Sequence, residues 1–168
     1  QRGLANVVMA INVSSLQFRR SNFIEHLQQT LQTNGLEPHW FEIELTESLL
    51  FENTEQVILK LQQVKQLGVK VSIDDFGTGY SSLSYLKNLP ISVLKIDKSF
   101  VREFLSQDTD HAIVRTILAM AESLSLTVVA EGVEQQAQFD ELVALGCDLF
   151  QGYLFGKPAP LNGAERAA

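Results

Sequence analysis

The chain has 168 residues, of which 45% are hydrophobic and 20% are charged, and its formal net charge at pH 7 is −7. This composition is that of a globular domain large enough for its own core, and no apolar run approaches the length of a membrane span. The negative charge argues against a general binding surface for a nucleic-acid polymer, so a phosphate-ester substrate would need a metal ion to supply positive charge locally. The single cysteine, Cys147, excludes an internal disulfide framework and fits a reducing compartment.

Segments typical of strands and helices alternate along the chain. Apolar and β-branched runs predict strands at residues 6–13, 40–46, 69–75, 93–97, 127–131 and 148–151. Apolar residues at helical spacing predict helices at residues 21–33, 47–67, 81–88, 98–105, 110–124 and 134–145. Strict alternation implies right-handed crossovers and a parallel sheet, either open and doubly wound or closed as a (β/α)8 barrel.

The polar residues at the strand ends favour the barrel. Each of the six strands has a polar residue at or near its carboxyl end, namely Asn12, Glu44, Asp74, Lys95, Glu131 and Gln151. Singly, each could be a helix cap, a turn residue or a solvent-facing side chain, but polar residues that close six apolar strands together lose burial energy unless they have partners. In a barrel these ends converge on one axis, whereas in an open sheet six positions could not meet. We therefore predict an α/β fold of the (β/α)8 TIM type, incomplete, with six βα units present and the first two strands missing.

Two adjacent carboxylates, Asp74 and Asp75, end the third strand. Neighbouring strand residues point to opposite faces, so Asp75 can join the site of Asp74 only if the chain already turns there, and Gly77 and Gly79 would permit this turn. A lone Asp-Asp pair is more often an N-cap and a solvated turn. Carboxylates held this close repel unless a cation or a proton lies between them. Together with Asn12 and without a Cys or His cluster, they form a set of hard ligands suited to Mg²⁺ or Mn²⁺.

The chain resembles the EAL-domain family, the cyclic di-GMP phosphodiesterases of bacteria. The motifs that carry the resemblance span nearly the whole chain: Asn12-Val13-Ser14, Glu44-Leu45-Thr46-Glu47, Asp74 to Ser82, Lys95-Ile96-Asp97, Ala130 to Glu134 and Gln151 to Phe155. The Glu-Ala-Leu signature and the nearby phosphate-binding Arg are absent and are expected upstream of Gln1. Residues 1–168 would then be the C-terminal two-thirds of a single EAL domain, with a disordered tail at residues 161–168.

The resemblance implies hydrolysis of cyclic di-GMP to linear pGpG with two Mg²⁺ or Mn²⁺ ions. It implies that one metal is bound by Asn12, Glu44 and Asp74, and that Asp74 bridges to a second metal served by Asp75 and Glu131. Lys95 would orient or acidify the attacking water, Glu134 and Gln151 would line the site, and Glu47 would anchor the loop that follows Asp75. Two cations about 3.5–4 Å apart can clamp a water and a phosphodiester for in-line displacement, which supports these roles on chemical grounds.

Two alternatives to the enzyme remain open at this point. The domain could only bind cyclic di-GMP, as degenerate members of the family do, or it could be an interaction domain that has lost the nucleotide. The first predicts replaced metal ligands and the second predicts erosion of the loop and of Gln151-Gly152-Tyr153, and the sequence has neither. The resemblance further implies a homodimer, a cytoplasmic domain, and upstream sensor or diguanylate cyclase domains in a parent that could be membrane-anchored. The 168 residues alone are expected to be inactive or impaired, because the missing part would carry a metal ligand and the Arg.

Overall fold

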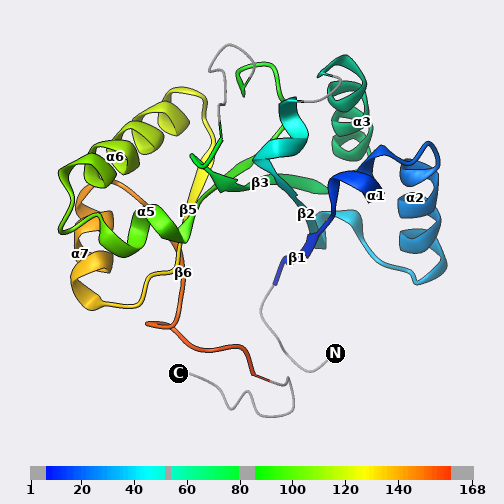
Figure 1. Ribbon diagram of the computed structural model, residues 1–168. Coiled ribbons are helices and arrows are strands. Elements are labelled where there is room, and N and C mark those ends of the chain that lie inside the picture. Colours follow the sequence, from blue (N-terminus) through cyan, green and yellow to red (C-terminus); the bar gives the residue numbers. More distant parts are fainter. Residues whose placement is uncertain (1–6, 52–53, 80–85, 160–168) are drawn as a thin grey trace.

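A single parallel sheet organises the chain, and its strands follow one another in sequence order (Figure 1). The computed structural model describes residues 7–51, 54–79 and 86–159. The strands are β1 (Met9–Asn12), β2 (Phe41–Thr46), β3 (Lys70–Phe76), β4 (Val93–Ile96), β5 (Thr127–Glu131) and β6 (Leu149–Gln151). Every neighbouring pair is parallel.

The strand order never reverses, which distinguishes this sheet from a doubly wound one. Successive right-handed crossovers place all helices on the same face of such a sheet, and the opposite face becomes the inside of a barrel. In Figure 1, α1, α2 and α3 lie at the right of the view, beside the β1 end of the curled sheet, and α5, α6 and α7 lie at the left, beside its β6 end. The prediction of an incomplete barrel is confirmed, and its six predicted strands are present.

The helices follow the predicted order with two local differences. Their bounds are α1 (Ser15–Arg19), α2 (Phe23–Thr33), α3 (Thr54–Gln66), α5 (Lys98–Glu103), α6 (Asp108–Ser123) and α7 (Gln136–Ala144). The short helix α1 was not predicted; it begins with a capping box in which Ser14 and Gln17 bond to each other's backbone. The predicted helix 47–67 is divided into a 3-10 turn, Glu47–Phe51, and α3.

The core lies between the sheet and the helices. On α3, the residues expected to point inward, Val57, Leu61 and Val64, are all at most 4% exposed. Strand β4, in the middle of the sheet, is buried at every position, as expected for a parallel strand covered on both faces. This buried frame fixes the strand ends that carry the polar side chains.

The two outer strands differ from the inner ones. Within the described sheet, β1 pairs only with β2 and β6 pairs only with β5. Met9 and Ile11 on β1 are 59% and 42% exposed, and Leu149 on β6 is 46% exposed. In the part of the chain that the structure describes, these two strands therefore lack a neighbour along one side, as in a barrel without its first two strands.

Some of the predicted features cannot be compared with the structure. The predicted tail at residues 161–168 and most of the predicted helix at 81–88 lie outside the described residues. Among the described helices, none combines the length and the apolar character that a membrane crossing requires.

Candidate metal centre

The register of the sheet brings the six predicted strand-end residues onto one face. Residues aligned on neighbouring parallel strands point to the same side. Asn12 aligns with Glu44, and Glu131 aligns with Gln151. Ser72 aligns with both Glu44 and Val93, which places Asp74 and Lys95, two residues further along their strands, on that face as well.

A β-bulge in β3 allows the adjacent carboxylates Asp74 and Asp75 to face the same site. The pairing of β3 with β4 shifts between Ile73 and Phe76, so that Asp74 and Asp75 together lie opposite one residue of β4. Asp75 has a left-handed backbone with φ of +54°, a conformation that aspartate tolerates better than most residues. The sequence analysis placed this turn at the end of the strand. Strand β3 instead continues to Phe76, so the turn lies inside the strand.

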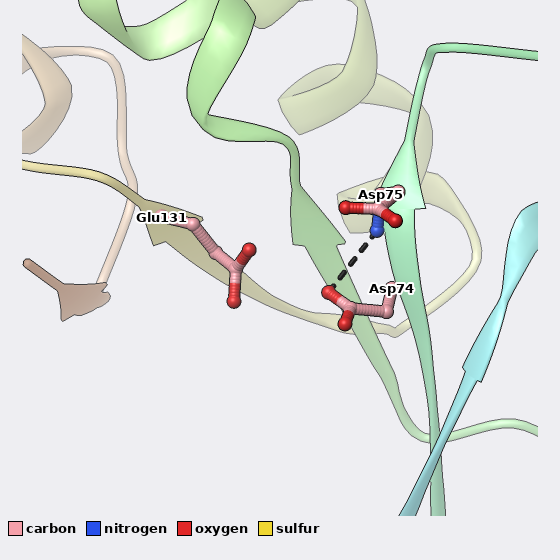
Figure 2. Close-up of side chains that lie close together, drawn as sticks. All are labelled: Asp74, Asp75 and Glu131. Atoms are coloured by element: carbon pink, nitrogen blue, oxygen red, sulfur yellow. Dashed lines mark hydrogen bonds between the residues drawn. The ribbon is translucent and has the colours of Figure 1, made fainter. Parts of the chain in front are cut away.

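The bulge lets Asp74 and Asp75 meet Glu131 from β5. One carboxylate oxygen from each of the three residues lies within 4.8 Å of the other two (Figure 2). The backbone N–H of Asp75 also donates to Oδ1 of Asp74 at 3.1 Å. Three carboxylate oxygens so close together match the hard oxygen ligands of a divalent cation such as Mg²⁺, Ca²⁺ or Mn²⁺. The donor set therefore fits the metal that the sequence predicted.

Lys95 supplies positive charge to the same cluster. Its Nζ lies 2.6 Å from Oε1 of Glu131, 2.8 Å from Oε1 of Glu44 and 3.4 Å from Oδ1 of Asp74. The side chain of Lys95 is only 5% exposed. The ammonium is thus a buried counter-ion shared by carboxylates from β2, β3 and β5.

The pKa values of the cluster reflect this crowding. Burial alone would lower the pKa of Lys95, but the hydrogen bonds to Glu131 and Glu44 outweigh it and raise the pKa above its ordinary value. Burial raises the pKa of Glu131 despite the opposing effect of Lys95. Burial also raises the pKa of Asp75, and the negative charges of Asp74 and Asp97 add to the increase. An additional cation would relieve the repulsion among these carboxylates.

Glu47 holds the start of the loop that follows β3. Its Oε2 accepts hydrogen bonds from the backbone N–H groups of Gly77 at 3.0 Å and of Gly79 at 3.1 Å, and the residue is 2% exposed. A Cβ added at Gly79 would lie 2.9 Å from the carboxylate of Glu47, so glycine permits this approach. These are the contacts that the role of loop anchor requires; the part of the motif at residues 80–82 lies outside the described residues.

Three predicted residues lie at the margin of the cluster. Asn12 and Gln151 are exposed at the ends of the two outer strands and join the others only through the register. Glu134 is exposed in the segment after β5, and among the described acidic residues it is not one of the three whose oxygens converge. The roles of these three residues remain predictions.

Two buried polar residues near the cluster received no role from the sequence. Asp97 is 9% exposed and accepts hydrogen bonds from the backbone N–H of Ser99 at 2.9 Å and from its hydroxyl. These bonds outweigh burial and hold the pKa of Asp97 below its ordinary value. Gln138 is 2% exposed and bonds to α5 and to the segment after β5. The signals in the sequence were a helix-capping Asp-x-Ser and a Gln-x-x-Gln pair at the start of α7.

A large groove lies elsewhere in the molecule. It has a volume of about 1090 Å³ and is lined by α6 from Ala112 to Ser123, by Ser125 to Val128 and by Leu145, Gly146 and Asp148. Because these segments lead into β5 and β6, the groove lies at the amino ends of the strands. The acidic cluster lies at the carboxyl ends, where barrel enzymes carry their active sites.

Known proteins are similar to this chain over almost its whole length. The "Bifunctional diguanylate cyclase/cyclic di-GMP phosphodiesterase MucR" of Pseudomonas aeruginosa is 44% identical over 158 residues, which are 94% of this chain and 23% of MucR. The "Cyclic di-GMP phosphodiesterase NbdA" of the same organism is 43% identical over 157 residues, which are 94% of this chain and 20% of NbdA. The chain thus spans about a quarter or less of the length of these curated relatives.

Solved structures are also similar to this chain over most of its length. The P. aeruginosa MucR phosphodiesterase in complex with c-di-GMP superposes with a TM-score of 0.89 at 44% identity, covering 92% of this chain and 63% of that one. A calcium/cy-diGMP complex of Klebsiella pneumoniae BlrP1 has a TM-score of 0.84 at 35% identity, covering 92% of this chain and 39% of that one. Residues 1–158 match the EAL domain family. The partial barrel, the acidic cluster at its strand ends and these similarities together establish that the chain belongs to the EAL domain family.

Proposed function

We propose that the domain hydrolyses cyclic di-GMP to linear pGpG with the help of two divalent cations, Mg²⁺ or Mn²⁺. The observation that carries the proposal is the meeting of Asp74, Asp75 and Glu131 beside the buried Lys95. The similarity to MucR and NbdA supports cyclic di-GMP as the substrate. The calcium/cy-diGMP complex of BlrP1 supports a metal at the site.

In this proposal the chain's carboxylates divide between two metal positions. Asn12, Glu44 and Asp74 would hold one ion, and Asp74, Asp75 and Glu131 would hold the other, so that Asp74 would serve both. The bound cations would neutralise charge on the phosphodiester and lower the pKa of the attacking water. The bulge at Asp74 and Asp75 supports this division, because it allows consecutive carboxylates to reach one site.

The remaining predicted residues contact the water or the substrate, or restrain the neighbouring loop. The three N–H donors of Lys95 face three carboxylates, so Lys95 would donate to a water or to a phosphate oxygen in exchange for one of these contacts, such as the longest, 3.4 Å to Asp74. Glu134 and Gln151 line the substrate side. Glu47 keeps the backbone of Gly77 and Gly79 close to the site, and so restrains the loop that follows the metal ligands.

The test combines turnover with metal binding. The full-length protein is incubated with cyclic di-GMP and Mn²⁺ or Mg²⁺, pGpG is followed by chromatography, and Mn²⁺ affinity is measured by calorimetry. We expect Asp74→Asn to abolish turnover and weaken both metal sites, and Asp75→Asn to weaken chiefly one. Binding of cyclic di-GMP without hydrolysis would show a sensor domain, and unchanged Mn²⁺ binding in both variants would refute the ligand assignment.

The partners of the domain extend the proposal. The length of MucR beyond the matched region, and its description as a diguanylate cyclase and phosphodiesterase, support upstream regulatory domains in the full-length protein. A homodimer and a cytoplasmic site of action, which the resemblance to the family implies, belong to the same proposal. Light scattering on the full-length protein, with and without cyclic di-GMP, tests the homodimer; a monomer under both conditions would refute it.

A further inference from the structure

A buried amide connects the segment that follows β5 with helix α5. Oε1 of Gln138 accepts hydrogen bonds from the backbone N–H groups of Glu134 and Gln135, both at 2.9 Å. Its Nε2 donates to the backbone carbonyls of Val101 at 3.0 Å and of Arg102 at 3.4 Å. A glutamine amide offers two donors and an oxygen with two acceptor sites, so this side chain is fully used.

The segment from Glu131 to Gln135 is in close contact with its neighbours on two sides. On the α5 side, a Cβ added at Gly132, which has φ of +69°, would lie 2.5 Å from Cβ of Lys98. On the β6 side, the N–H of Val133 donates to the carbonyl of Gln151 at 3.1 Å, and its carbonyl accepts from the N–H of Leu154 at 3.1 Å. The segment therefore has little room to move, and Gln138 holds its last two residues, Glu134 and Gln135, by hydrogen bonds.

The position of Gln138 relates directly to the cluster. The segment begins with Glu131, whose carboxylate lies 2.6 Å from Nζ of Lys95. Helix α5, which Gln138 binds at its last turn, starts directly after Asp97, two residues beyond Lys95. The amide thus links the chain that follows β4 to the chain that follows β5, a few residues beyond the ion pair of Lys95 and Glu131.

We propose that Gln138 is a positioning residue of this site. It fixes the segment from Glu131 to Gln135 against α5 and thereby holds the carboxylate of Glu131, and the backbone that carries Glu134, where metal and substrate need them. The inference rests on the proposed function and adds to it a residue that touches neither metal nor substrate. Glutamine is required because the amide alone accepts from two N–H groups and donates to two carbonyls at the same time.

The experiment compares two variants of Gln138 with a control on the same helix. Gln138→Met keeps the length of the side chain and removes all four hydrogen bonds. Gln138→Glu keeps the acceptor for Glu134 and Gln135 but places an oxygen against the two carbonyls of α5. Leu142→Ala, at a fully buried position of α7, removes packing and leaves the amide intact. All variants are made in the full-length protein, and we measure their thermal stability, kcat and KM for cyclic di-GMP, and Mn²⁺ affinity by calorimetry.

We expect Gln138→Met to lower kcat and Mn²⁺ affinity by about tenfold to a hundredfold, the usual effect of losing a residue that orients a metal ligand. KM should change much less than kcat. Gln138→Glu should have a smaller effect in the same direction, and it carries the test if Gln138→Met does not fold. Leu142→Ala should lower thermal stability but keep wild-type kcat and Mn²⁺ affinity at temperatures where it is folded.

Wild-type kcat and Mn²⁺ affinity in the folded Gln138 variants would overturn the proposal. So would losses no larger than those of Leu142→Ala, because they would show a purely structural role. A wild-type protein that binds Mn²⁺ without hydrolysing cyclic di-GMP refutes the proposed function, and the Mn²⁺ affinities of the variants then still decide the role of Gln138. A wild-type protein with neither property overturns both.

Discussion

Removal of the Lys95 charge is the sharpest test of how the cluster is balanced. In Lys95→Met an apolar stem replaces the buried ammonium, and the carboxylates of Glu44, Asp74 and Glu131 lose the cation within 3.4 Å of each of them. Loss of one partner from a buried ion pair costs about 3–5 kcal/mol, because the remaining charge stays buried without compensation. For a domain of this size, about 1 kcal/mol corresponds to about 2–4 °C in Tm, so we expect Tm to fall by roughly 6–20 °C without metal.

Added Mn²⁺ should restore much of this loss. A divalent cation at the cluster would supply the charge that the lysine no longer provides, so Mn²⁺ should stabilise Lys95→Met more than it stabilises the wild type. The assay is denaturant and thermal unfolding with and without saturating Mn²⁺, with Lys65→Met on the exposed face of α3 as the control. The control should stay within about 0.5 kcal/mol of the wild type. A metal-free Lys95→Met as stable as the wild type, with an equal response to Mn²⁺, would refute the reasoning.

Four further outcomes follow from the same structure. Because the pKa of Lys95 in the folded protein is raised above its ordinary value of 10.5, its contribution to stability is fully present below that pH and is lost progressively as the pH rises from there through the higher folded-state pKa. The difference in unfolding free energy between wild type and Lys95→Met should therefore stay constant between about pH 7 and 9 and shrink only above about pH 10.5, and a difference that shrinks already near neutrality would contradict this. Glu47→Gln weakens charge-assisted bonds to the loop and should lower kcat and raise KM by roughly tenfold, whereas the exposed Glu55→Gln should have wild-type kinetics; equal kinetics in both would remove Glu47 as an anchor. Gly152→Ala would bring a Cβ to 2.1 Å from the carbonyl oxygen of Val133, and this overpacking should lower the free energy of unfolding, measured with denaturant, by about 3 kcal/mol or more. A loss below about 1 kcal/mol would show that the segment relaxes around the added methyl group. The 168 residues expressed alone should associate through the outer edges of β1 and β6, so light scattering should show a species larger than the monomer. A monomer that unfolds cooperatively and is active would contradict this prediction.

The sequence by itself determined the order of the strands and the polar residues that stand at their ends. A run such as Thr127-Val128-Val129-Ala130-Glu131 is apolar until its last position, and this local pattern both defines a buried strand and marks its polar end. All six predicted strands are present, and the polar residues at their ends lie on one face. Such features can be predicted because strand formation and burial are encoded within a few neighbouring residues.

The tertiary structure decided how these side chains meet. Nothing in the sequence states that β3 continues to Phe76 with a bulge, because a bulge exists only relative to the pairing of the neighbouring strand. The sharing of Lys95 among Glu44, Asp74 and Glu131 likewise depends on three other strands. The bonds of Gln138 to Val101 join residues 37 positions apart. In each case the energy lies in contacts between segments distant in the chain, so the fold has to form before the interaction exists.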